Sequence, residues 1–167
     1  VKDGLIHAIT PRLPANVAVE TFDGEGLALC PGFIDVHTHS DMSLMASPEG
    51  FGKLSQGVTT EVAGNCGLSA FPVTERNIDH LQDLYANYNV AITWRDVAGY
   101  AAELARRRPT VNLACLCGHN TLRGAVMGYD KTEPTPERLK RMRSLLADNL
   151  GKGAIGFSTG LLYSPGK

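Results

Sequence analysis

The chain is organised around the stretch Pro31-Gly32-Phe33-Ile34-Asp35-Val36-His37-Thr38-His39-Ser40-Asp41. Residues 33–36 are a short apolar run behind a Pro-Gly breaker, which predicts a buried strand that begins directly after a turn. His37 and His39 are two positions apart, so an extended backbone directs both imidazoles to the same side. Two neutral imidazoles at a strand end can hold one metal ion, although each ring could instead be hydrogen-bonded at the surface.

Composition is that of an ordinary globular protein. The 167 residues are 43% hydrophobic and 20% charged, with a formal net charge of −1, so charge gives no support for a nucleic-acid or membrane partner. No apolar stretch approaches the ~20 residues that cross a bilayer, and the first residues lack the pattern of a signal peptide. The four cysteines are too sparse for a disulfide scaffold, which favours reduced thiols in a cytoplasmic protein.

Strand and helix patterns alternate along the chain. Short β-like pieces at 5–9, 17–22 and 27–29 are too few to fold alone, so residues 1–30 are expected to be the N-terminal β segment of a small β-domain. After the histidine strand, further strands are predicted at 58–63, 111–117 and 154–158.

Helices are predicted between these strands, at 48–56, 74–88, 94–108 and 136–150. In the first helix Phe51 and Leu54 are expected to point inward, and the third is expected to begin at a Thr93 cap. The fourth should have Thr135 as its cap and an inward stripe of Leu139, Met142, Leu145, Leu146 and Leu150. Four strand-helix units predict a parallel β/α architecture with its site at the carboxyl ends of the strands, either an open doubly wound sheet or part of a barrel.

Several reactive side chains follow the predicted strands. Cys66 lies in the turn Gly64-Asn65-Cys66-Gly67-Leu68-Ser69, where flanking glycines hold it at the end of the second strand. A buried free thiol is the alternative for Cys66, and packing is expected for Cys115 and Cys117 inside the third strand. His119 follows the third strand and Tyr163 the fourth.

These motifs resemble the amidohydrolase superfamily and, more narrowly, the D-aminoacylases or N-acyl-D-amino-acid deacylases. The resemblance is carried by PGFIDVHTH at 31–39, GVTTEVAGNCGLS at 57–69, GHNTLR at 118–123 and GAIGFSTGLLY at 153–163, in collinear order over almost the whole chain. It implies that residues 31–167 are the N-terminal half of a TIM-like β/α barrel in a longer enzyme, with 1–30 in the small β-domain.

The resemblance also implies a site and a reaction. His37, His39 and Cys66 are the implied zinc ligands, with Cys66 in place of the carboxylated lysine found elsewhere in the superfamily. Tyr163 is expected to contact substrate, and His119 to contact substrate or stabilise its own loop. The implied reaction is zinc-dependent hydrolysis of an N-acyl-D-amino acid. The acid/base aspartate is expected downstream of Lys167, so no catalytic residue is assigned here and Asp35 and Asp41 are not equated with it.

Two other hypotheses remain open. One is a cyclic amidohydrolase of the hydantoinase or dihydroorotase type, which a lysine ligand from a later strand would favour. The other is a catalytically inactive truncated module. Because four strands leave two open sheet edges, such a module could form a homo-oligomer that covers them.

Overall fold

The computed structural model describes residues 1–12 and 20–164 and divides the chain into two units, Val1–Pro31 and Gly32–Lys167. Among the described residues of the first unit, an isolated antiparallel bridge joins Lys2 and Leu5, and no strand forms at 5–9 or 27–29. The strands predicted at those two places do not form, because a strand needs a hydrogen-bonded partner strand and, apart from the Lys2–Leu5 bridge, these largely exposed pieces have none among the described residues. Residues 17–19 of the remaining piece lie outside the described residues, and the small β-domain stays a prediction.

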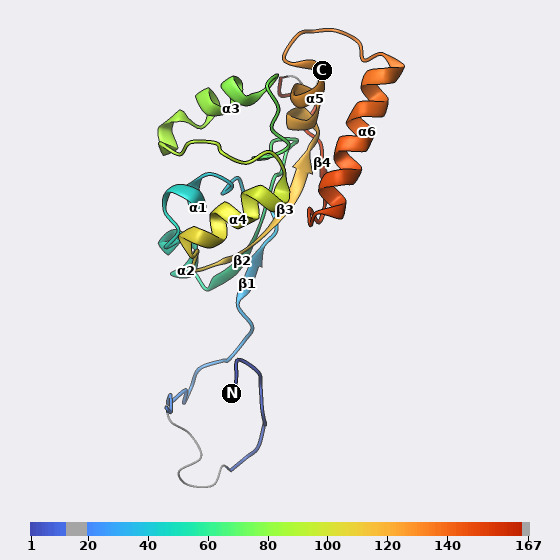
Figure 1. Ribbon diagram of the computed structural model, residues 1–167. Helices are drawn as coiled ribbons and strands as arrows, with labels where there is room; N and C mark the ends of the chain where they lie inside the picture. The colour runs from blue at the N-terminus through green and yellow to red at the C-terminus, as the bar shows by residue number, and fades with distance from the viewer. Residues whose placement is uncertain (13–19, 165–167) are drawn as a thin grey trace. The chain divides into compact units, whose positions relative to one another are not determined.

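The second unit contains one parallel sheet in the order β1-β2-β3-β4 (Figure 1). Its strands are β1 (Phe33–Asp35), β2 (Val58–Ala63), β3 (Asn112–Gly118) and β4 (Gly156–Ser158). All four strand predictions are confirmed in place and type, with β2 at its predicted bounds and the ends of the others shifted by one or two residues. Spatial order follows chain order without the reversal that marks a doubly wound sheet, so the fold is a partial TIM-like barrel.

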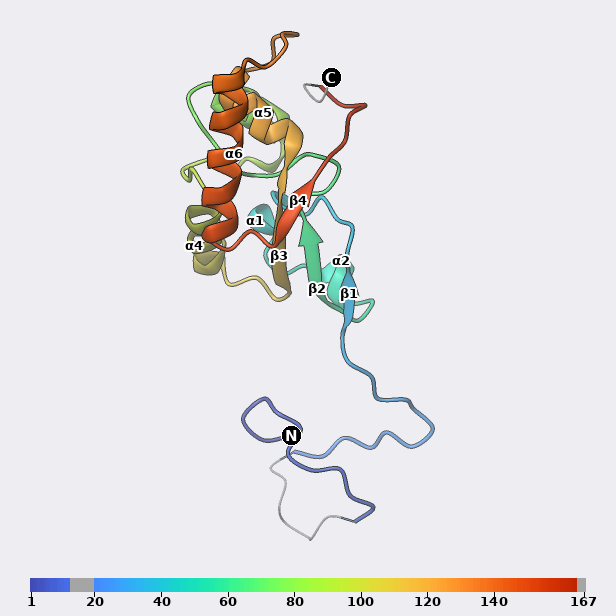
Figure 2. The same cartoon turned by 90° about the vertical axis from the view of Figure 1, so that its right-hand side faces the viewer.

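Helices connect the strands and cover one face of the sheet (Figure 2). They are α1 (Ser43–Ala46), α2 (Phe51–Leu54), α3 (Ile78–Leu84), the 3-10 helix η1 (Ala86–Tyr88), α4 (Val97–Arg107), α5 (His119–Met127) and α6 (Pro136–Gly151). Within the described part of the chain, no helix has the length and apolar character needed to span a membrane.

The helix predicted at 48–56 is too long. Only the one-turn helix α2 forms within that range, and a second one-turn helix, α1, ends before it at Ala46, with residues 47–50 between the two. Pro48 disfavours a helical backbone at Ser47, and Gly50 takes a left-handed conformation with φ of 52°. The side chains of Phe51 and Leu54 are 74% and 40% exposed rather than inward.

Helix caps decide where the longer helices begin. Asp96, and not Thr93, caps α4: its Oδ1 accepts the Gly99 N–H at 2.9 Å, and Trp94 is buried ahead of the helix. An aspartate cap is at least as favourable as threonine, so the later residue sets the start. The cap at Thr135 is confirmed, because its Oγ1 accepts the Arg138 N–H at 3.3 Å.

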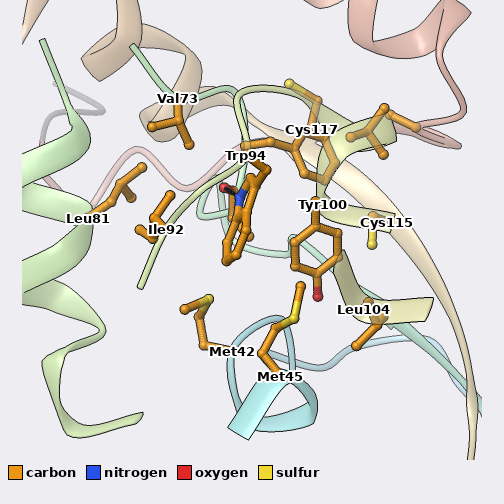
Figure 3. Close-up of a cluster of buried hydrophobic side chains, with 14 of the residues drawn as sticks. Met42, Met45, Val73, Leu81, Ile92, Trp94, Tyr100, Leu104, Cys115 and Cys117 are labelled. Atoms are coloured by element: carbon orange, nitrogen blue, oxygen red, sulfur yellow. Dashed lines mark hydrogen bonds between the residues drawn. The ribbon is translucent and has the colours of Figure 1, made fainter. Parts of the chain in front are cut away.

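The core lies between the sheet and its helices (Figure 3). Trp94 and Tyr100 pack edge to face and bond through their polar ends, Trp94 Nε1 to the Ala70 carbonyl at 2.8 Å and Tyr100 OH to the Asp41 carbonyl at 2.6 Å. Cys115 and Cys117 are buried in this core as predicted. Of the stripe predicted on α6, Met142, Leu145 and Leu146 pack against the core, whereas Leu139 and Leu150 are each 41% exposed.

The opposite face of the sheet is open. Alternation along the strands places Ala63 and Cys115 toward the helices and Ile34, Val62 and Leu116 on the other side. Ile34 is 62% exposed, and Val62 and Leu116 are only half-buried. In a closed barrel this face would be the interior. Pairing of copies through the open edges stays a prediction.

Candidate metal centre

Three potential ligand side chains converge where the first two strands end. One ligand atom from each of His37, His39 and Cys66 lies within 4.8 Å of the other two. The Nε2 atom of His37 is 3.3 Å from Sγ of Cys66, and the two imidazole rings stand edge to face at 5.9 Å between centroids. The structure thus brings together the three residues that the sequence predicts as a cluster.

Buried Thr38 fixes the loop that carries the two histidines. Its N–H and its Oγ1 both donate to the Val62 carbonyl at 3.1 Å, which ties the loop to β2. Asn65 adds a bridge from the other side, because its Nδ2 donates to the carbonyls of Thr38 and Val62 at 3.3 and 2.8 Å. With Thr38 held inward, His37 and His39 remain exposed on either side of it.

Cys66 sits in a left-handed conformation with φ of 54°. That region costs an ordinary residue roughly 1–2 kcal/mol, so the surroundings must enforce it. Gly64, two residues earlier, has φ of 80°, and any side chain at that position would collide with the Leu116 carbonyl of β3. The Gly67 carbonyl accepts the N–H groups of Asn120 and Thr121 at 2.8 and 3.2 Å, which docks the turn on the first residues of α5.

The two aspartates near the histidines do not join the cluster. Asp35 pairs with Lys53 at 2.5 Å, and the Lys53 hydrogen bond is the main reason that the pKa of Asp35 is lowered. Asp41 is buried and accepts the Gly64 and Ala70 N–H groups at 3.4 Å each. Burial raises the pKa of Asp41 to about 6.

A buried carboxylate beneath the histidine loop was missed from the sequence. Glu61 of β2 is 0% exposed, and its Oε2 accepts the Ser40 hydroxyl at 2.7 Å. Lys53 Nζ lies 3.7 Å from the same oxygen and also binds Asp35, so one ammonium is shared between two carboxylates. The available signal was a lone acid within the otherwise uncharged strand 58–63, because such an acid is seldom buried without a partner.

His119 and Tyr163 share a different hollow, a cavity of about 560 Å³ also lined by Arg123 and Lys131. His119 is the first residue of α5, and burial lowers its pKa, which favours the neutral ring. Its buried Nδ1 has no hydrogen-bond partner among the described residues. Tyr163 is exposed, and its carbonyl accepts Asn120 Nδ2 at 3.1 Å. His37, His39 and Cys66 do not line this cavity.

Fold and cluster together define a partial β/α barrel with two imidazoles and a thiol at the carboxyl ends of its first two strands. Residues 20–165 match the model of the Amidohydrolase family, and the chain belongs to this family.

Named relatives and solved structures narrow the similarity. An N-acyl-D-aspartate deacylase of Alcaligenes xylosoxydans xylosoxydans is 44% identical over 149 residues, which are 88% of this chain and 29% of the relative. A D-aminoacylase with a binuclear metal centre matches with a TM-score of 0.70 and 41% identity over 81% of this chain and 28% of that one. An N-acyl-D-glutamate deacylase from Bordetella bronchiseptica, complexed with zinc and a phosphonate mimic of the tetrahedral intermediate, matches equally well, with a TM-score of 0.70. The chain thus spans less than a third of the length of these relatives.

Proposed function

We propose that the protein containing this chain hydrolyses the amide bond of N-acyl-D-amino acids with zinc held by His37, His39 and Cys66. The observation that carries the proposal is the convergence of these three side chains, whose ligand atoms all lie within 4.8 Å of one another. Two imidazoles and a thiolate are a donor set that zinc accepts. The deacylase names of the relatives support the reaction class and the D-configured substrate.

Held by His37, His39 and Cys66, a zinc ion would supply Lewis acidity for polarising the scissile carbonyl and activating a water molecule. The chain's own contribution is to hold the ligands ready. Thr38 anchors the histidine loop to Val62, and the docked turn fixes Cys66, so little rearrangement is needed on binding. No carboxylate of the described residues lies within the cluster, and the proton-transferring aspartate is therefore proposed to come from a part of the enzyme outside this chain.

His119 and Tyr163 are proposed to contact the substrate. The cavity that they line also contains Arg123, whose guanidinium is almost entirely buried and has no carboxylate within ion-pair distance among the described residues. Its guanidinium donates to the carbonyls of Asp130 and Thr132, and the acidic residues Asp130 and Glu133 line the same cavity as Lys131. Arg123 and Lys131 are the two cations proposed to pair with a substrate carboxylate. The neutral His119 ring offers a hydrogen-bonding nitrogen beside it.

The test is an assay of the complete product of the gene that encodes this chain, loaded with zinc. N-acetyl-D-amino acids should release free D-amino acid, the L-isomers should not react, and a chelator should abolish release. A hydantoin or dihydroorotate hydrolysed in preference to these linear amides would favour the cyclic-amidohydrolase hypothesis. No hydrolysis of any of these substrates by the zinc-loaded protein would contradict the proposal.

A further inference from the structure

Ser158, the last residue of β4, makes both of its hydroxyl hydrogen bonds to the turn that carries Cys66. Its Oγ accepts the Gly67 N–H at 3.0 Å and donates to the Gly64 carbonyl at 2.5 Å. A serine hydroxyl has a single proton to donate. Ser158 therefore uses that proton on the backbone before Cys66 and a lone pair on the backbone after it.

This contact crosses the sheet. Cys66 follows β2, whereas Ser158 ends β4, and β3 lies between the two strands. The register partner of Ser158 on β3 is Gly118, where any side chain would collide with the Gly67 carbonyl. The missing side chain at Gly118 thus lets the turn from β2 lie over the end of β3 and reach β4.

The Cys66 side chain has few restraints of its own. The hydrogen bond recorded for its Sγ is the one with His37, and its left-handed backbone is intrinsically unfavourable. The direction of the thiol therefore depends on the peptide groups on either side of Cys66. Among the described residues, Ser158 is the side chain that bonds to both Gly64 and Gly67, whereas buried Asp41 accepts from Gly64 and, farther along, from Ala70.

We infer that Ser158 is a positioning residue for the Cys66 thiolate in the metal centre, a role that rests on the proposed function of that centre. By this account β4 supplies no ligand but sets the affinity of the site. Groups that orient metal ligands typically change metal affinity about 10- to 100-fold when they are removed. We expect a loss in that range when the hydroxyl is lost.

The experiment compares S158T with S158V, two variants of nearly equal shape that differ in the hydroxyl. Zinc affinity of the chain is measured by competition with a chromophoric chelator, and thermal unfolding is followed by circular dichroism. S158T should keep the wild-type affinity, while S158V should bind zinc about 10- to 100-fold more weakly. In the metal-free proteins, alkylation of Cys66 relative to exposed Cys30 should be faster in S158V than in S158T.

Equal zinc affinity and equal Cys66 alkylation in the two variants would overturn the positioning role. If the wild-type chain binds no zinc, the metal centre fails, and the alkylation ratio still decides whether Ser158 orders Cys66. If S158V does not fold, exchange of the Gly67 amide in the wild-type, metal-free chain decides instead. That amide should exchange far more slowly than exposed Gly24, and equal rates would contradict the Ser158 bond.

Discussion

Nε2 of His37 lies 3.3 Å from Sγ of Cys66, although 29 positions separate the two residues in the chain. The parallel pairing of β1 with β2 produces this contact, because Asp35 is in register with Glu61 and both strands end at the same edge. Each residue then follows its strand by a few positions. Neither side chain could reach the other if the strands slipped in register, so the geometry of the cluster depends on the sheet beneath it.

The Thr38 anchor predicts that the histidine loop loosens when the hydroxyl is lost. T38V removes the bond that Oγ1 donates to the Val62 carbonyl and the 2.7 Å contact between Oγ1 and the Ser40 hydroxyl. We expect the free energy of unfolding to fall by about 1 kcal/mol, with weaker zinc binding. Urea titration and chelator competition measure the two effects. T38S keeps the hydroxyl and serves as the control; a T38V protein equal to T38S would show that the anchor does not matter.

The Glu61 network predicts that removing its cation is costly. K53M leaves buried Glu61 with the Ser40 hydroxyl and without its ammonium neighbour. Losing a charged partner at a buried group typically costs about 1–3 kcal/mol, and urea denaturation should show a decrease in this range. The double variant K53M/E61Q should recover part of the loss, because a neutral amide can still accept the Ser40 proton. No recovery would mean that charge burial is not the cause.

The cap of α4 predicts a pH-dependent effect on stability. The Lys152 ammonium and the Gly99 N–H hold the pKa of Asp96 below its ordinary value of 3.8. The ionised carboxylate therefore stabilises the fold above that value, and this stabilisation is lost as the pH falls through the lowered pKa. D96A should reduce the free energy of unfolding by about 1 kcal/mol at pH 7 and by less in acid.

The matched control for D96A is D148A. Asp148 also binds Lys152, at 2.7 Å, but is the cap of no helix. Because this pair is exposed, D148A should have little effect at any pH. Equal losses in D96A and D148A would assign the effect to the ion pair rather than to the cap.

The four thiols should react in two groups. Cys30 is exposed and Cys66 is half-buried, whereas Cys115 and Cys117 are buried, and burial raises the pKa of Cys117 to about 12. Only thiolates alkylate readily, so iodoacetamide at pH 8 should modify Cys30 and Cys66 and spare the other two in the folded chain. Peptide mapping by mass spectrometry measures this. Early modification of Cys117 would contradict the placement of β3 in the core.

Sequence predicted correctly the strands and helices whose formation depends mainly on neighbouring residues. The β-branched residues at 58–63 favour a strand by themselves, and Thr135-Pro136 favours a helix start by itself. Both predictions are confirmed. The pieces at 5–9 and 27–29 have strand-like composition but no partner strand among the described residues, and composition alone does not make a strand.

The candidate site likewise contains residues that local sequence predicts and one residue that it does not. His37, His39 and Cys66 could be predicted, because each is marked by the strand in front of it. Ser158 could not, because its role comes from contacts across 91 and 94 positions of sequence. Its motif was visible, but nothing local showed that the hydroxyl would meet the Cys66 turn.

The most direct test of the central claim is the zinc content of the chain after dialysis, measured by native mass spectrometry for the wild type, C66A and C117A. We expect the wild type and C117A to retain zinc and C66A to lose it, because Cys66 supplies a ligand and Cys117 is a core residue. Zinc retained by C66A at the wild-type level, or absent from the wild type, would rule out Cys66 as a zinc ligand.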